Sequence, residues 1–117
     1  MFMNNIRPFY FWNIGKSVVK YQNKYDNVVK KISNIYCYKF GLSYTFSCEN
    51  IKNMKLFYLC FPVFYKNMNE ISWNHYLKLI NIFDRDKRNF YFKVILYYNI
   101  EYGDFVMGLD NYVFERI

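Results

Sequence analysis

The chain has 117 residues, enough for one hydrophobic core and too few for two domains, so we expect a single domain over residues 1–117. It is 54% hydrophobic and 25% aromatic, and its formal net charge is +7. The longest apolar run is too short to span a bilayer and is broken by Pro62, and the N-terminus lacks the apolar region of a signal peptide. These features argue against a membrane or secreted protein and predict a cytoplasmic one.

Metal and disulfide frameworks are not expected either. The three cysteines, Cys37, Cys48 and Cys60, are odd in number and form no CxxC pair, which favours a reducing compartment. With His75 as the single histidine, a structural zinc site is not expected, and no cofactor is implied.

The positive charge lies mainly in the N-terminal part of the sequence. Residues 1–40 have seven basic side chains and one acid, a net charge of +6, whereas residues 41–83 carry +2 and the remainder −1. Such an asymmetry suits a partner with an acidic surface, such as the backbone of a nucleic acid. Solvated lysines on ordinary helices explain it about as well.

Two helices are predicted before residue 41. Pro8 suits the first turn of a helix that runs to about Tyr21, and Gly15 in its middle would let another helix approach closely. Asp26 is expected to cap a second helix that ends at Gly41. The apolar residues expected on the buried face of this second helix are Val28, Val29, Ile32, Ile35, Tyr36 and Phe40.

The helix after Ser47 has a start signal, an apolar stripe and a stop. Ser47 is a good N-cap, and Pro62 should end the helix near Cys60. Its apolar stripe consists of Ile51, Met54, Tyr58 and Phe61. This pattern is typical of a core-packing helix. It also fits the second helix of a helix-turn-helix, because a helical segment and a short loop precede it.

Three further helices are predicted after residue 70. Ser72 is expected to cap one that ends near Phe83, and Asp84 or Asp86 one that runs to about Tyr98. Asp104 is expected to cap a sixth helix. No strand alternation interrupts the helices, so the predicted fold is an all-α compact bundle of about six helices with a helix-turn-helix-like core.

Five short phrases occur in order along the chain: FWNIG, FSCENIKNMKLFY, ISWNHYL, RNFY and YVFER. Together they resemble the N-terminal domain of the YhcG-type PD-(D/E)XK nuclease family, a bacterial domain of poorly defined function. The residues that match the family's phrases, for which we expect structural roles, are Trp12, Gly15, Phe46, Ser47, Asn50, Met54, Tyr58, Ser72, Trp73, His75, Tyr76, Arg88, Tyr91, Phe114, Glu115 and Arg116.

The resemblance implies a helical domain of helix-turn-helix type that precedes a nuclease domain and helps it to engage DNA or partner proteins. At Ile117 the family would continue into the nuclease, whose catalytic Asp, Glu and Lys have no counterpart in these residues. We therefore expect a stand-alone or truncated module that is not an enzyme. The family commonly has basic residues between the matched Ser47 and Asn50, whereas this chain has Cys48 and Glu49.

Three side chains could suggest a site of chemistry or stacking. His75 is where a catalytic argument would start, but no Ser or Cys nucleophile has an obvious base-and-orienter arrangement with it, so we expect hydrogen bonding across the fold instead. Trp12 and Trp73 could stack on nucleic-acid bases. A tryptophan on a helical stripe is more often a core residue, and we favour that interpretation.

For DNA binding the sequence favours Lys52 and Lys55 on the central helix, with Lys30, Lys31 and Lys39 on the preceding helix as phosphate contacts. The main hypothesis is thus an accessory module that binds double-stranded DNA. The alternatives are a protein-interaction module, which docks onto a nuclease domain or forms a homo-oligomer, and a truncated non-functional remnant.

Overall fold

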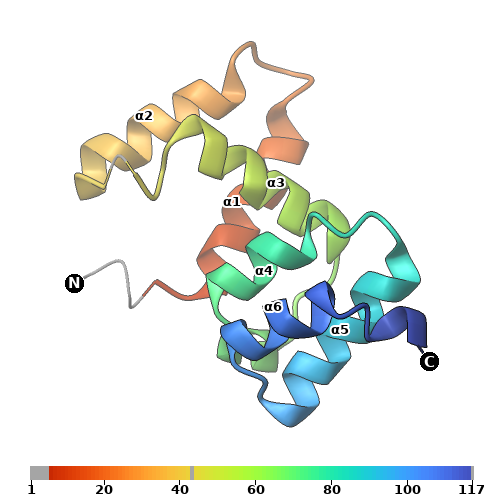
Figure 1. Cartoon of the computed structure of the whole chain (residues 1–117). Coiled ribbons are helices and arrows are strands. Elements are labelled where there is room, and N and C mark those ends of the chain that lie inside the picture. The colour runs from red at the N-terminus through yellow and green to blue at the C-terminus, as the bar shows by residue number, and fades with distance from the viewer. Residues whose placement is uncertain (1–5, 43, 117) are drawn as a thin grey trace. The chain divides into compact units, whose positions relative to one another are not determined.

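The computed structural model describes residues 6–42 and 44–116, which form six α-helices and two short 3₁₀ helices and contain no strand (Figure 1). The all-α prediction is confirmed. The elements are α1 (Pro8–Tyr21), α2 (Val28–Phe40), α3 (Cys48–Cys60), η2 (Lys66–Glu70), α4 (Trp73–Leu79), α5 (Arg85–Tyr98), α6 (Tyr102–Asp110) and η3 (Phe114–Arg116). None of the helices in the described residues is long and apolar enough to cross a membrane.

The chain divides into two compact units, which we call the N-terminal unit, Met1–Phe64, and the C-terminal unit, Tyr65–Ile117. The N-terminal unit contains α1, α2 and α3, and the C-terminal unit contains the remaining elements. Each unit is described by itself below. The expectation of a single domain stays a prediction.

In the N-terminal unit, α1 packs closely on α3. A Cβ atom at Gly15 would lie 1.9 Å from the backbone oxygen of Met54, so only glycine fits between the two helices. The Trp12 indole N–H donates to the carbonyl of Phe61, with a nitrogen–oxygen distance of 2.7 Å. Close approach of another helix at Gly15, which the sequence predicts, is therefore confirmed.

The start of α2 differs from the prediction, whereas its end agrees with it. The N-cap position is held by Asn27 in the left-handed region, with φ 55°, and no side chain caps the helix there. The predicted cap at Asp26 is wrong because the first helical residue is Val28, so Asp26 lies one residue too early. Gly41 ends the helix with φ 64°, a conformation that glycine adopts without steric cost.

The helix α3 follows the sequence pattern closely. The Ser47 hydroxyl accepts from the N–H of Asn50 at 3.2 Å and so caps the helix as predicted. Ile51, Met54 and Phe57 are fully buried. The predicted end near Cys60 is also confirmed.

In the C-terminal unit, α4 begins as predicted and ends early. Ser72 caps it by accepting from the N–H of His75 at 3.3 Å. The helix ends at Leu79 rather than near Phe83, because the backbone then forms tighter bonds, from the N–H of Ile82 to the carbonyl of Leu79 for example. The buried Tyr76 hydroxyl donates to the Met68 carbonyl of η2 at 2.6 Å, and burial raises the pKa of this phenol.

The last two helices differ in how they are capped. Asp84 caps α5 by accepting from the N–H of Lys87 at 3.1 Å, which resolves the choice between Asp84 and Asp86. The predicted cap of α6 at Asp104 is wrong: Glu101 holds that position without a side-chain bond, and Asp104 lies in the first turn. In the first turn its carboxylate lies near the positive end of the helix dipole, so Asp104 stabilises the start of α6 without capping it.

Candidate nucleic-acid interface

The whole net charge of the protein belongs to the N-terminal unit. That unit has nine basic and two acidic side chains, a net charge of +7, whereas the C-terminal unit has seven of each and is neutral. In residues 6–42 and 44–116 the one ion pair joins Lys87 to Glu115 at 2.6 Å, in the C-terminal unit. The basic side chains of the N-terminal unit are therefore not neutralised by carboxylates within the described chain.

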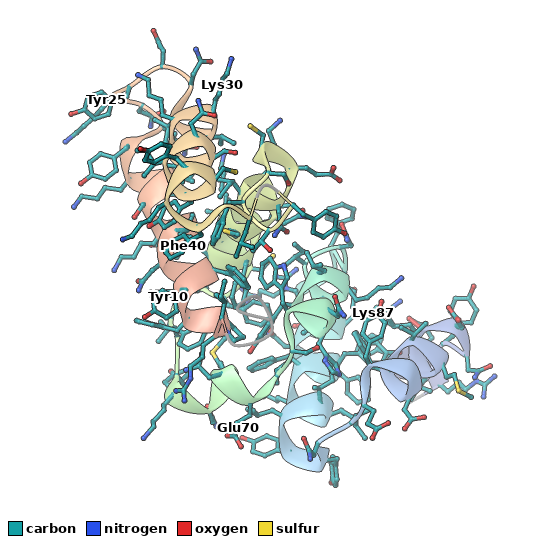
Figure 2. All side chains as sticks on the ribbon, turned by 90° about the vertical axis from the view of Figure 1, so that its left-hand side faces the viewer. Tyr10, Tyr25, Lys30, Phe40, Glu70 and Lys87 are labelled. Carbon is teal, nitrogen blue, oxygen red and sulfur yellow. The ribbon has the colours of Figure 1, made fainter. Side chains whose placement is uncertain are left out.

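These basic side chains are also accessible. Eight of the nine are exposed and Lys55 is half-buried; the set is Arg7, Lys16, Lys20, Lys24, Lys30, Lys31, Lys39, Lys52 and Lys55. Three of the ammonium groups lie over aromatic rings of their own helix, at 5.3 to 5.4 Å from the ring centroid. The pairs are Lys16 with Trp12, Lys20 with Tyr21, and Lys39 with Phe40. Figure 2 shows Lys30 and Tyr25 projecting from the end of the unit where α1 connects to α2.

One side of α2 is exposed to solvent, and we call it the outer face of α2. Its six residues form two rows along the helix at a spacing of four residues: Lys30, Asn34 and Tyr38 in one row, and Lys31, Ile35 and Lys39 in the other. All six are exposed, Ile35 by 62% and Tyr38 by 93%. Asn34, Ile35, Tyr38 and Lys39 line an open hollow on this face.

The opposite side of α2 sets which residues face outward. The Ser33 hydroxyl donates to the carbonyl of Phe46 at 2.5 Å, and the Tyr36 ring stacks on the Phe46 ring with a centroid distance of 5.2 Å. These contacts fix the rotation of the helix, and they turn Ile35 to solvent. The prediction that Ile35 and Phe40 are buried is therefore wrong, since Phe40 is also exposed, although its ring stacks on Phe46.

The five predicted DNA-binding lysines fall into two groups. Lys30, Lys31 and Lys39 lie together on the outer face of α2. Lys52 and Lys55 lie three residues apart on α3, where Lys52 is exposed. Within the described residues no hydrogen bond or ion pair joins the two groups.

The exposed part of α3 is less polar than a recognition helix would require. Leu56 and Leu59 are 41% and 51% exposed, and Glu49 near the start of the helix adds a negative charge. The connection from α2 to α3, Gly41 to Ser47, is seven residues long, whereas the turn of a helix-turn-helix has three or four. The helix-turn-helix assignment stays a prediction.

Trp12 and Trp73 differ in their accessibility. Trp12 is buried, with Tyr58 and Phe64 rings 5.3 and 5.7 Å away, so its ring is part of the core. Trp73 is half-buried. A more accessible aromatic ring on α2 is that of Tyr38, which is 93% exposed and was not predicted from the sequence as a site residue. The sequence signal for Tyr38 is its spacing of four residues from Asn34 and eight from Lys30, which puts the three in one row of the outer face of α2.

His75 takes part in a linked set of hydrogen bonds in the C-terminal unit. Its Nε2 donates to the carbonyl of Ile100 at 2.9 Å, so Nδ1 is the acceptor and receives the Ser72 hydroxyl at 2.6 Å. Serine, imidazole and carbonyl are thus linked by hydrogen bonds, which agrees with the expectation that His75 forms hydrogen bonds across the fold. Burial lowers the pKa of His75.

This arrangement joins elements of the C-terminal unit. The His75 ring stacks on Phe105 at 5.9 Å, and the same Ser72 hydroxyl caps α4. The hydrogen bond to Ile100 spans 25 residues and connects α4 to the segment before α6. In the described residues no three His, Cys, Asp or Glu side chains are placed to hold a metal ion.

Arg88, another of the residues shared with the family phrases, is a buried cation. It is 9% exposed, and its Nη1 donates to the carbonyl of Ile82 at 2.7 Å. Its Nε is buried without a hydrogen-bond partner, and no carboxylate of the described residues lies within ion-pair distance. A buried guanidinium with so few partners contributes little to stability.

Several other residues of the family phrases make contacts inside their own unit. Asn50 donates to the carbonyl of Thr45 at 2.6 Å and so holds the connection before α3. The Tyr91 hydroxyl donates to Gly108 at 3.3 Å and accepts from the N–H of Phe114 at 3.2 Å. These bonds join α5, α6 and η3.

One family model matches the chain, and it covers residues 3–116. Its description is the DUF1016 N-terminal domain. The chain belongs to this family. DUF1016 is the YhcG family, so the resemblance seen in the five phrases is confirmed. The match runs through both units, and therefore includes the basic surface and the His75 linkage. Searches of curated proteins and of solved structures gave no match.

Proposed function

We propose that this DUF1016 N-terminal domain is a non-catalytic accessory module that binds DNA through the basic surface of its N-terminal unit. The observation that carries the proposal is the placement of the entire +7 charge on one unit, on side chains without ion pairs in the described residues. Lysines that are not neutralised by the protein can release counterions from a phosphate backbone, which is the main source of affinity in non-specific DNA binding.

The outer face of α2 has the main part in this proposal. Lys30, Lys31 and Lys39 supply three cations without an acid on the same face, and Lys52 and Lys55 on α3 supply further phosphate contacts. The exposed leucines and Glu49 make α3 less suited than α2 to lie against a polyanion. In this proposal the domain assists a PD-(D/E)XK nuclease of the family by delivering or positioning the DNA.

The test is fluorescence anisotropy of a labelled random duplex, titrated with the purified protein over a range of salt concentrations. We expect affinity to fall steeply with salt, with a log–log slope of roughly −0.9 for each phosphate contacted. Replacing Lys30, Lys31 and Lys39 together with Gln should reduce the slope by about 3 at most. A matched control is Lys66→Gln with Lys78→Gln and Lys93→Gln in the neutral C-terminal unit, which should leave the slope unchanged.

The same assay examines α3 separately. The double replacement Lys52→Glu and Lys55→Glu should weaken binding if these side chains approach phosphate. Binding that survives both sets of substitutions unchanged would refute the proposed surface. Absence of duplex binding at low salt would refute the binding of double-stranded DNA.

Protein docking is the second candidate, and a specific observation favours it. Leu56 and Leu59 lie three residues apart on the exposed part of α3, and large apolar side chains gathered on a surface often mark a contact with a protein. Analytical ultracentrifugation of the wild type and of a Leu56→Asp, Leu59→Asp variant tests self-association through this segment. A wild type that is monomeric at high concentration would exclude a homo-oligomer.

A further inference from the structure

The outer face of α2 combines its lysines with the exposed aromatic side chain of Tyr38. Tyr38 is 93% exposed and lies in the last turn of α2. Exposed tyrosines are common at loop ends, but here the ring stands on a helix whose opposite side is held by Ser33 and Phe46. Within residues 6–42 and 44–64 of the N-terminal unit, no ring contact or hydrogen bond requires an aromatic ring at this position.

The neighbours of Tyr38 form a small platform with cations at both ends. Ile35 lies three residues before it and Asn34 four before it, so both are adjacent to it on the helix surface. Lys30 and Lys31 precede this apolar centre and Lys39 follows it. From Lys31 to Lys39 the helix rises by about 12 Å. Asn34, Ile35, Tyr38 and Lys39 line the open hollow at this place.

We propose that this platform stacks an unpaired nucleobase, so that the preferred ligand is single-stranded nucleic acid. This inference rests on the proposed function and names its substrate class. An aromatic ring offers a flat surface to the face of a base, and in a duplex that face is covered by the neighbouring base pairs. Single strands expose it, and their phosphates reach the lysines at either end of the platform.

Charge decides against a protein as the occupant of the platform. A protein partner would have to supply carboxylates to three lysines as well as an apolar group to Ile35 and Tyr38. A single strand supplies regularly spaced negative charges and flat π-faces in one polymer, and base–aromatic stacking tolerates any sequence. The side chain of Asn34 adds a donor and an acceptor next to the ring, which suits the edge of a stacked base.

The experiment compares a labelled single strand of about 16 nucleotides with the duplex of the same sequence, in anisotropy titrations at matched salt. We expect the single strand to bind more tightly. Tyr38→Ala should weaken single-strand binding by roughly 5- to 150-fold, the range of one stacked base, and leave duplex binding nearly unchanged. Tyr38→Phe, which keeps the ring, should retain most of the affinity.

The matched control is Tyr97→Ala, which removes a tyrosine that is also exposed on a helix, but in the neutral C-terminal unit. It should change neither affinity. Circular dichroism of the Tyr38 variants checks that the helices are intact, as expected for so exposed a side chain.

The outcomes separate the two proposals. If the duplex binds as tightly as the single strand and Tyr38→Ala changes neither, base stacking is wrong and DNA binding through the lysines stands. If neither form binds at low salt, both proposals are wrong. If the single strand binds more tightly but Tyr38→Ala has no effect, the platform is wrong as the site of discrimination.

Discussion

Gly15 lies so close to Met54 that a Cβ atom at position 15 would be 1.9 Å from the Met54 oxygen and 2.5 Å from its carbonyl carbon. The clash is with backbone, which cannot rotate away as a side chain could. The packing of α1 on α3 therefore depends on the absence of one carbon atom.

Replacing Gly15 with alanine should separate the two helices and lower the free energy of unfolding by about 3 kcal/mol or more. Urea denaturation followed by circular dichroism measures this. Gly103→Ala in α6 is the matched control, because a Cβ atom there meets nothing within 4 Å. That substitution should be neutral or stabilise by up to about 1 kcal/mol. Equal effects of the two substitutions would contradict the close contact.

Protonation of His75 should destabilise the protein. Burial lowers its pKa in the folded state below the ordinary value of 6.5. Between the two pKa values the unfolded chain binds the extra proton and the folded chain does not, so stability rises with pH in this window. The stability that the neutral His75 contributes is fully present above pH 6.5. It is lost as the pH falls toward the lower pKa of His75 in the folded state.

His75→Gln should be less stable than the wild type near pH 7 and should show a smaller loss of stability between neutral and mildly acidic pH. Since His75 is the single histidine, the comparison isolates one imidazole. Urea unfolding at a series of pH values provides the data. A pH dependence that is the same in both proteins would show that His75 does not cause it.

Arg88→Met should lower the free energy of unfolding by less than about 1 kcal/mol, or should raise it. Methionine keeps much of the buried volume and removes a cation that has no ion pair in the described residues, while the Ile82 carbonyl loses one donor. Arg88→Ala, which leaves a cavity, should cost roughly 2 kcal/mol or more. A large loss for methionine would mean that an anion pairs with this guanidinium.

Ser33→Ala should lower the free energy of unfolding by about 1 to 3 kcal/mol, because the carbonyl of Phe46 loses its closer donor and keeps the Cys37 thiol at 3.5 Å. The serine also sets the rotation of α2, so single-strand binding should weaken in the same variant. Ser17→Ala, in a half-buried position of α1, is the control for removal of a helical serine hydroxyl. Urea unfolding and anisotropy report the two effects separately.

The sequence predicted the helices that have a side-chain cap better than it predicted the starts of helices without one. Ser47, Ser72 and Asp84 were found as caps because a short polar side chain before an apolar stripe is a local signal. Asn27 and Glu101 were missed because neither side chain accepts a capping hydrogen bond. Their helices start where tertiary packing makes a start favourable, and a local pattern does not contain that information.

The candidate interface was predicted in part for a similar reason. The lysines of α2 could be assigned to a solvated stripe from periodicity alone. The exposure of Tyr38 and Ile35 could not, because apolar residues occupy most faces of α2 and the bond from Ser33 to Phe46 decides which of them turns outward. Likewise, the alignment of Ser72, His75 and the Ile100 carbonyl joins residues 25 positions apart, and no spacing rule points to a backbone carbonyl.

The two tryptophans are divided between the units, Trp12 in the first and Trp73 in the second. Because one is buried and the other half-buried, their intrinsic emission should differ in wavelength and quenching. A Trp73→Phe variant then reports on the N-terminal unit alone, and Trp12→Phe on the C-terminal unit. The chain thus contains a separate optical reporter for each half, and a single denaturation series can follow whether the halves melt together or in sequence.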